Sequence, residues 1–201
     1  MAFNINSFRS QLGFDGARPN LFEIIMTPPA EAGGLFATEK LAFMCKAAQI
    51  PGTTINSVDV PYFGRQVKVA GNRTYDNWTI TVINDEDFAT RRVFENWHNM
   101  VLNRPISNVR SRRGTNTYEY GVDALVLHYG KEGDVIRSYQ MVGMWPTEVA
   151  PIDLAWDTND TIEEFTVTFA YQYWMTPETS AAEGDYSGLL RTGVGAIVGG
   201  L

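Results

Sequence analysis

The chain is poor in the residues on which many functional sites depend. Its 201 residues include one cysteine, Cys45, and two histidines, His98 and His128. A single cysteine excludes an internal disulfide framework and fits a reducing compartment. We interpret Cys45 as a small apolar residue inside a strand. Neither histidine has a cysteine or an acid at a metal-ligand spacing, so we expect no metal site.

Long apolar runs are also missing. No stretch approaches the roughly 20 apolar residues that a membrane-spanning helix needs. The first residues, MAFNINSFRSQLGF, lack the basic-then-apolar order of a signal peptide. We therefore expect a soluble, unsecreted protein. At this length, one β-rich domain can bury roughly 70% of the surface that the unfolded chain exposes.

Basic residues are fewer than acidic ones, 16 against 23, which gives a net charge of -7. This deficit argues against nucleic-acid binding, which depends on lysine and arginine neutralising phosphates, and we expect no direct sequence-specific binding. A surface past which DNA slides without sticking would carry the same sign. The one basic cluster is interpreted as pairing with acids of an adjacent subunit rather than with phosphates; it comprises Arg104, Arg110, Arg112 and Arg113.

Catalytic and cofactor motifs are lacking. The sequence contains no GxSxG, HExxH, CxxC or P-loop spacing. The glycines of residues 193–199 superficially resemble a dinucleotide-binding loop, but the third glycine is one position late. The acid pairs Asp157/Asp160 and Glu163/Glu164 lie in a turn and at a strand start, where solvation explains them. We expect no catalytic, cofactor or metal site, and no enzyme.

What the sequence does contain is a series of strand patterns separated by turn residues. We predict strands at 21–27, 41–47, 65–70, 78–84, 120–129, 135–145, 149–156 and 163–174. Gly71, Asn72, Asp76 and Asn77 are interpreted as turn formers ahead of the strand that begins at Trp78. Pro151 favours an edge or bulged strand for 149–156. This pattern predicts a sandwich or barrel.

Two strands differ in which faces are apolar. Apolar residues alternate from Phe165 to Tyr173, which predicts one packed face. We interpret the aromatics Tyr171, Tyr173 and Trp174 as core or subunit packing rather than as a platform for stacking sugars or bases. Leu125, Val126 and Leu127 are apolar on both faces, as in a strand that a helix or a neighbouring subunit covers.

One segment, 85–102, has helical periodicity. Its apolar arc comprises Ala89, Val93, Phe94, Trp97, Met100 and Val101. Asn84 is the expected N-cap, with Asp87 three positions later as in a capping box. The predicted fold is therefore mainly β, with two packed antiparallel sheets as a sandwich or small barrel and one flanking α-helix. We expect an N-terminal arm at 1–19, a β-domain at 20–174 and a C-terminal extension at 175–201.

Several ordered blocks of sequence match a known family. They are ARPNLF (17–22), CKA (45–47) with Pro51, VAGNRTYDNWT (69–79), VINDE (82–86), GMWPT (143–147) and LAWDTNDTI (154–162), which leads into 165–174. Over roughly residues 17–174 the chain resembles the tail tube proteins of contractile-tailed (myovirus-type) bacteriophages. The segment after Trp174 departs from the shorter family members.

The resemblance implies a structural virion protein that assembles in the host cytoplasm. In that family six subunits form a ring, the inner strands of which join into one barrel, and rings stack into a tube. A sheath surrounds the tube, baseplate proteins initiate it, and the tape-measure protein and later the genome occupy its lumen. Sheath contraction drives the tube through the host envelope. Interfaces in such an assembly should exceed about 2,000 Å² per pair.

The resemblance also implies where subunits meet. We expect 50–63 to form a hairpin-like segment that bridges to the next ring. Arg18, Arg65 and Arg73 are expected to form inter-subunit ion pairs. The further candidate contacts are Pro51, Pro61, Phe63, Arg110, Arg112 and Arg113. Two alternatives stay open, the tube of a bacterial contractile injection or type VI-like system and a carbohydrate-binding β-sandwich.

Overall fold

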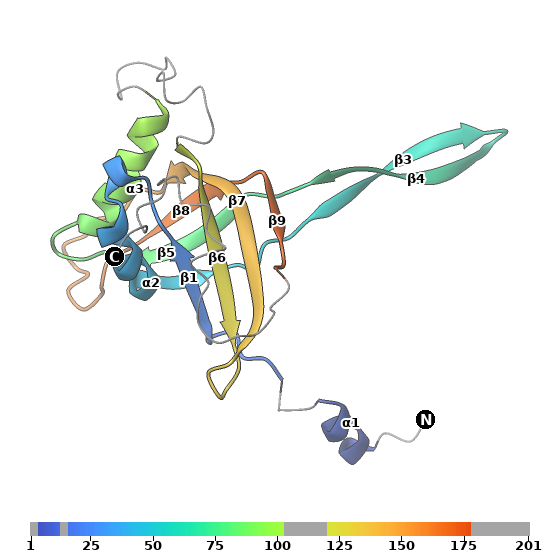
Figure 1. The fold of residues 1–201 in the computed structure, drawn as a ribbon, viewed down its shortest axis with the longest axis horizontal. Helices are drawn as coiled ribbons and strands as arrows, with labels where there is room; N and C mark the ends of the chain where they lie inside the picture. Colours follow the sequence, from blue (N-terminus) through green and yellow to red (C-terminus); the bar gives the residue numbers. More distant parts are fainter. Residues whose placement is uncertain (1–3, 13–15, 103–119, 178–201) are drawn as a thin grey trace, which may run out of the picture.

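Strands build the body of the protein, α2 and α3 lie on its flank, and α1 lies apart from it (Figure 1). The computed structural model describes residues 4–12, 16–102 and 120–177. In chain order the elements are α1 (Ile5–Gln11), β1 (Phe22–Met26), η1 (Ala30–Ala32), α2 (Leu35–Met44), β2 (Cys45–Ala48), β3 (Thr54–Tyr62), β4 (Arg65–Thr74), β5 (Trp78–Ile83), α3 (Ala89–Val101), β6 (Val122–Tyr129), β7 (Val135–Val149), β8 (Glu164–Ala170) and β9 (Tyr173–Met175).

Seven strands of the body form one antiparallel ladder in the order β1-β6-β7-β8-β5-β2, and β9 also pairs with β7. The 15-residue strand β7 joins two layers, because its first part pairs with β6 and β9 while its last part pairs with β8. Between these parts Gly143 has a φ of +63°, a conformation that favours glycine. The predicted two antiparallel layers are confirmed, and β7 makes them continuous.

The core lies between the sheet and α3. Alternate residues of β5 and β8 are buried, among them Val82 and Phe169. From α3, Phe94 stacks edge-on against Phe165 with ring centroids 6.1 Å apart, and Trp97 lies 6.0 Å from the Phe169 ring. The predicted helix and its packed face are therefore confirmed. The predicted two-sided burial of β6 is also confirmed at residues 125–127.

The start of this helix differs from the prediction. α3 begins at Ala89, after Phe88, which adopts the left-handed conformation with a φ of +53°. Asn84 is not the N-cap, because its side chain donates to Glu163 Oε2 at 2.8 Å and ties the end of β5 to the residue before β8. The N-cap is Phe88, whose side chain makes no capping hydrogen bond, and Asp87 Oδ1, one residue earlier, accepts from the Ala89 amide at 3.3 Å. The Asn84 side chain therefore makes a tertiary hydrogen bond with Glu163 and does not cap the helix.

Two predicted strands are wrong in part or whole. Residues 41–44 belong to α2, and only 45–48 form a strand; a short apolar run does not by itself distinguish a buried helix from a strand. Residues 150–163 form a loop rather than a strand, because β7 continues from the preceding hairpin through Val149. Gly71 and Asn72 lie within β4, where the pairing register shifts, and not in a turn. The alternation ends at Tyr171, and Tyr173 is an exposed residue of β9.

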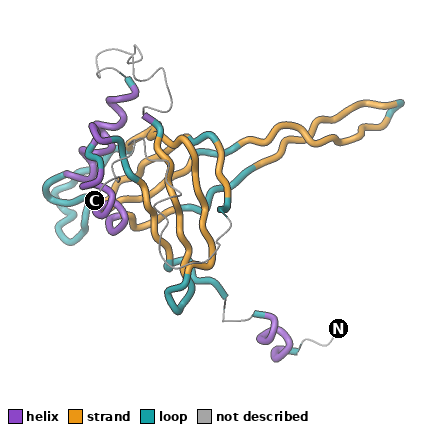
Figure 2. Tube along the Cα trace, in the orientation of Figure 1, coloured by secondary structure: helices purple, strands orange, loops and turns teal. Residues whose placement is uncertain are grey.

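The remaining two strands leave the body altogether. β3 and β4 pair only with each other and form a long hairpin that projects from the sheet (Figures 1 and 2). Its two arms correspond to the predicted hairpin-like segment 50–63 and the separately predicted strand 65–70. α1 also lies away from the body, on the N-terminal arm.

Candidate assembly surface

The hairpin, residues 54–74, has one apolar face and one polar face. Side chains paired across two strands share a face. One face carries three such pairs, namely Val58 with Val69, Val60 with Val67, and Tyr62 with Arg65. The other carries Ser57 with Ala70, Asp59 with Lys68, and Pro61 with Gln66. We call the first of these the apolar hairpin face.

Nothing in the described chain covers the apolar hairpin face. Its four valines are between 47% and 55% exposed, and Tyr62 is 67% exposed. Each face of a two-stranded ribbon needs a covering layer to bury apolar side chains, and a lone hairpin is marginally stable in water. Contiguous exposed apolar surface of this kind is typical of an interaction site.

The base of the hairpin is fixed to the body while its tip is free. Trp78 Nε1 donates to Gln49 O at 2.6 Å, and Trp174 Nε1 donates to Gly52 O at 3.1 Å. Thr53 Oγ1 donates across the base to Thr74 O at 3.3 Å. The body thereby sets the direction in which the hairpin points.

The tip is a tight turn with an aromatic residue in an uncommon conformation. Phe63 and Gly64 have φ values of +42° and +81°, the signs that a type I′ turn requires at both central positions. Asparagine and glycine are the usual residues there. Phe63 is instead 93% exposed and stacks edge-on against Tyr62, with centroids 4.8 Å apart. A large apolar side chain held at an exposed, strained turn points to a contact outside the chain.

The structure places the predicted contact residues in different surroundings. Pro61, Phe63, Arg65 and Arg73 all lie exposed on the hairpin, the two arginines opposite Tyr62 and Ile55. Pro51 is buried at the hairpin base. The expected role of Pro51 as a contact residue stays a prediction.

Other predicted contact residues do not join the hairpin. Arg18 lies exposed on the N-terminal arm ahead of β1 and makes an interaction of its own. Arg104, Arg110, Arg112 and Arg113 fall outside the described residues, as do the glycines at 193–199. The expected inter-subunit role of all these residues stays a prediction.

Two exposed apolar groups were missed by the sequence reasoning. One is formed by Ile5 and Phe8 of α1 and by its C-cap residue Leu12, which recur at helical spacing. The other is the loop 150–163, where Leu154 and Trp156 are 81% and 102% exposed. The sequence does contain a signal for this loop, since Leu154 and Trp156 lie among turn-forming residues. It was missed because 149–156 was predicted as a strand.

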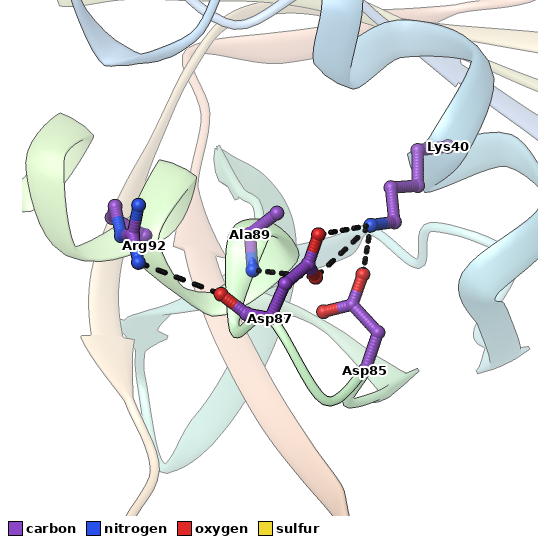
Figure 3. A network of polar contacts seen from close by, with 5 residues as sticks. All are labelled: Lys40, Asp85, Asp87, Ala89 and Arg92. Carbon is purple, nitrogen blue, oxygen red and sulfur yellow. Dashed lines mark hydrogen bonds and ion pairs between the residues drawn. The ribbon is translucent and has the colours of Figure 1, made fainter.

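A charged network holds the flank of the body together (Figure 3). The ammonium of Lys40 on α2 contacts Asp85 Oδ2 and lies 3.3 Å from Asp87 Oδ1. The hydrogen bond from the Ala89 amide is the main cause that lowers the pKa of Asp87 below its ordinary 3.8, and the Asp85 side chain and the Lys40 ammonium lower it further. The Asp85 side chain is the main cause of the raised pKa of Lys40. This network joins α2 to the start of α3 and has a structural role.

Within the described residues, the cysteine thiol and the possible metal ligands lie in surroundings that do not activate them. Burial raises the pKa of the Cys45 thiol to about 12, so it carries almost no thiolate at neutral pH. Among the residues described, no group of three or more histidine, cysteine, aspartate or glutamate side chains could hold a metal ion. No described helix is long and apolar enough to cross a membrane.

Comparison with known proteins decides the family. Residues 17–177 match the family described as phage tail tube protein. The chain belongs to the phage tail tube protein family. It is 32% identical over 161 residues to tail tube protein gp19 of Enterobacteria phage T4, covering 80% of this chain and 91% of that protein. It is also 22% identical to the tail tube protein of Serratia phage KSP90, with 83% and 93% covered.

Solved structures show the same fold at much lower identity. A chain in the cryo-EM structure of the PVC sheath-tube complex, an extracellular contractile injection system, has a TM-score of 0.55 at 11% identity and covers 83% of this chain and 95% of its own. A chain of the anti-feeding prophage tube-terminating cap has a TM-score of 0.58 at 12% identity, with 80% and 89% covered. These likenesses concern the fold.

Family membership confirms the central prediction. The chain is a tail tube protein of contractile-tailed phage, a structural component of the virion and not an enzyme. The solved complexes that contain chains of this fold include a sheath-tube complex, a baseplate and a tube-terminating cap. The carbohydrate-binding alternative loses its basis, because the match spans the whole β-body and not a single aromatic strand.

Proposed function

We propose that the chain is the major tube subunit, that six copies form a ring, and that rings stack into a tube through the hairpin. The lumen would hold the tape-measure protein before ejection and conduct the genome during it, without sequence-specific binding. A baseplate protein would initiate the tube and a sheath would surround it, after synthesis in the host cytoplasm. The single observation that carries this proposal is the projecting hairpin with its uncovered apolar face.

The physical argument is that the isolated chain is incomplete. The ladder ends at the edge strands β1 and β2, and free edges are templates for pairing with another chain. The hairpin adds a second unsatisfied surface, directed away from the body (Figure 2). Identical copies can supply both missing neighbours, one around the ring and one along the tube.

A truncated hairpin tests the stacking role. Replacing residues 58–69 by Asn-Gly leaves Ser57 and Ala70 as the closing pair of a two-residue turn, which such strands favour. The body should keep its thermal midpoint, because none of the removed residues belongs to the core. Negative-stain microscopy should show rings without tubes. The matched control is Gln66→Ser on the polar face, which should form normal tubes.

Two results would overturn the proposal. Tubes of normal length from the truncated variant would show that the hairpin does not bridge rings. A wild-type chain that remains monomeric at every concentration, and that is missing from tubes isolated from virions, would remove the tube role itself.

The alternative, the tube of a bacterial contractile injection system, rests on the shared fold alone, whereas the sequence relatives are phage tail tube proteins. Neighbouring genes distinguish the two. Capsid and terminase genes beside this one would support a phage tail, whereas effector genes without capsid genes would support the injection system.

A further inference from the structure

We propose that the apolar hairpin face of one copy docks on the loop 150–162 of a copy in the next ring, with Arg65 beside Asp157. This inference rests on the proposed function and names the receiving surface, which we call the acceptor loop. The argument uses three properties of the acceptor loop: its fixed ends, its exposed apolar side chains and its charge.

The acceptor loop is held at both ends, so its middle is presented in a defined way. At its start, Arg91 of α3 donates to Ala150 O at 3.1 Å. Just after its end, the backbone N–H of Asn84 donates to the backbone carbonyl of Glu163 at 2.8 Å. A turn in the middle is closed by Thr158 Oγ1, which donates to Ala155 O at 2.8 Å. The turn places Trp156 on the outside.

The acceptor loop exposes large apolar side chains, whose contact with water is unfavourable. Trp156 is fully exposed, and Leu154 and Ile162 are 81% and 71% exposed. A tryptophan that lies completely outside the core is a typical anchor of an interface. Its partner should therefore offer apolar surface, which the apolar hairpin face does.

The charges of the two surfaces are complementary. The acceptor loop carries Asp153, Asp157 and Asp160 and no basic residue. Within the described chain these three carboxylates form no ion pair. The hairpin carries Arg65, Lys68 and Arg73 against a single acid, Asp59. Opposite charge at an interface directs the encounter and fixes the register.

Each of the two surfaces has an exposed aromatic side chain, Tyr62 on the apolar hairpin face and Trp156 on the acceptor loop, and the residues beside them give the register. Arg65 lies opposite Tyr62 on the apolar hairpin face, and Asp157 follows Trp156 directly in the acceptor loop. Placing the two aromatic side chains in contact brings this basic and this acidic residue together. The expected pair is therefore Arg65 with Asp157.

The geometry of the fold excludes a contact within one copy. The hairpin extends to one end of the long axis of the molecule, whereas the acceptor loop, drawn in light orange, lies beside α2 and α3 at the opposite end (Figure 1). A contact between two different patches on identical subunits is heterologous, and it repeats without closing when the subunits are related by a translation. Such a contact suits the growth of a stack.

Charge reversal with rescue tests the pairing. Like charges facing each other at an interface cost several kcal/mol, so Arg65→Glu or Asp157→Arg alone should raise the protein concentration at which tubes form by at least about tenfold. The double variant restores an opposite pair and should recover most of the loss. Pelleting at a series of concentrations and negative-stain microscopy measure tubes, and sedimentation velocity measures rings. Glu132→Arg, an exposed acid on the β6–β7 turn, is the matched control and should form tubes normally.

The outcomes separate this inference from the proposed function. If Arg65→Glu abolishes tubes while Asp157→Arg forms them normally, the hairpin bridges rings but docks elsewhere, and the inference fails alone. Failure of the double variant to recover any tubes would also overturn it. If the truncated hairpin still gives normal tubes, both proposals fail together.

A disulfide crosslink tests directly whether the hairpin tip of one copy contacts the acceptor loop of another. In a Cys45→Ser background, Phe63→Cys combined with Asp157→Cys should give a ladder of disulfide-linked chains on non-reducing gels after mild oxidation of assembled tubes. The pair Phe63→Cys with Glu132→Cys should not. Assembled tubes in which the first pair forms no ladder would contradict the inference, as would a crosslink to a different protein in sheathed tails.

Discussion

At the scale of single residues, Phe63 is unusual because it places an aromatic side chain at a turn position where asparagine or glycine is usual. Phe63 is the only non-glycine residue of the described hairpin with a positive φ. The left-handed conformation costs roughly 1–2 kcal/mol for an ordinary residue, and asparagine tolerates it better. The chain keeps an unfavourable residue at a site that contributes nothing to its own core.

Exchanging this residue should therefore separate stability from assembly. Phe63→Asn should leave the free energy of unfolding of the free subunit unchanged or raise it by up to about 1 kcal/mol, while tube formation weakens. Urea unfolding and pelleting measure the two effects. Phe63→Tyr is the control, since it keeps the exposed ring. A variant that loses stability and still forms tubes normally would contradict this interpretation.

A second residue-scale prediction concerns acid. The lowered pKa of Asp87 means that its ionised form is stabilised by folding. That contribution is complete above the ordinary value of 3.8 and is lost as the pH falls through the lower folded value. Asp87→Asn should thus lower the thermal midpoint at neutral pH. In strong acid the thermal midpoints of the variant and of the wild type should converge. A difference that persists unchanged in strong acid would assign the loss to the amide itself.

At the scale of elements, α3 and the hairpin contrast in where their apolar residues go. α3 buries Phe94 and Trp97 completely, and the Trp97 indole donates to Tyr120 O at 2.6 Å. The hairpin leaves its valines half exposed. The helix therefore stabilises the subunit, whereas the hairpin is available to stabilise a contact between subunits.

Substitutions in α3 should change the free energy of unfolding strongly, whereas substitutions in the hairpin should change it little. Trp97→Ala should lower the free energy of unfolding by roughly 3–5 kcal/mol, as large-to-small substitutions of fully buried aromatics do. Val60→Ser and Val67→Ser together should change it little, since water already reaches both side chains. Urea titrations of the free subunit measure both. An equally large loss for the valine variant would mean that the hairpin is part of the core.

At the scale of the whole molecule, the net charge bears on what the assembled tube retains. A subunit with a net charge of -7 repels the phosphate backbone, so its assembled tube should let duplex DNA pass without retention. Purified tubes mixed with short DNA duplexes at moderate salt should leave the DNA in the supernatant after pelleting. Retention that decreases as salt rises would reveal a basic lumen and contradict this expectation.

Much of the body could be predicted because local patterns and tertiary packing agree. The alternation at Phe165, Val167 and Phe169 and the arc of α3 each indicate one buried face, and those faces pack together. The helix start could not be predicted, because Asn84 can cap a helix or pair with Glu163, and only the folded sheet brings Glu163 within 2.8 Å.

Most of the candidate assembly surface could not be located in this way. The sequence identified Phe63 and Arg65 as contact residues through its resemblance to the family, but divided the hairpin between two separate predicted segments. The acceptor loop was predicted in part as an edge or bulged strand at 149–156, whereas β7 ends at Val149. Which apolar side chains stay uncovered depends on the path of every other element.

The sequence by itself determined the class of this protein: its ordered blocks match the tail tube family, and alternation with one helical arc specified a β-body with a flanking helix. Tertiary structure alone decided that β3 and β4 leave the sheet, that Phe63 occupies a left-handed turn, and that the acceptor loop lies at the opposite end. The physical reason is that periodicity reports which face of an element is apolar, whereas exposure is set by what packs against it, and here two apolar surfaces have no partner within the described part of the chain.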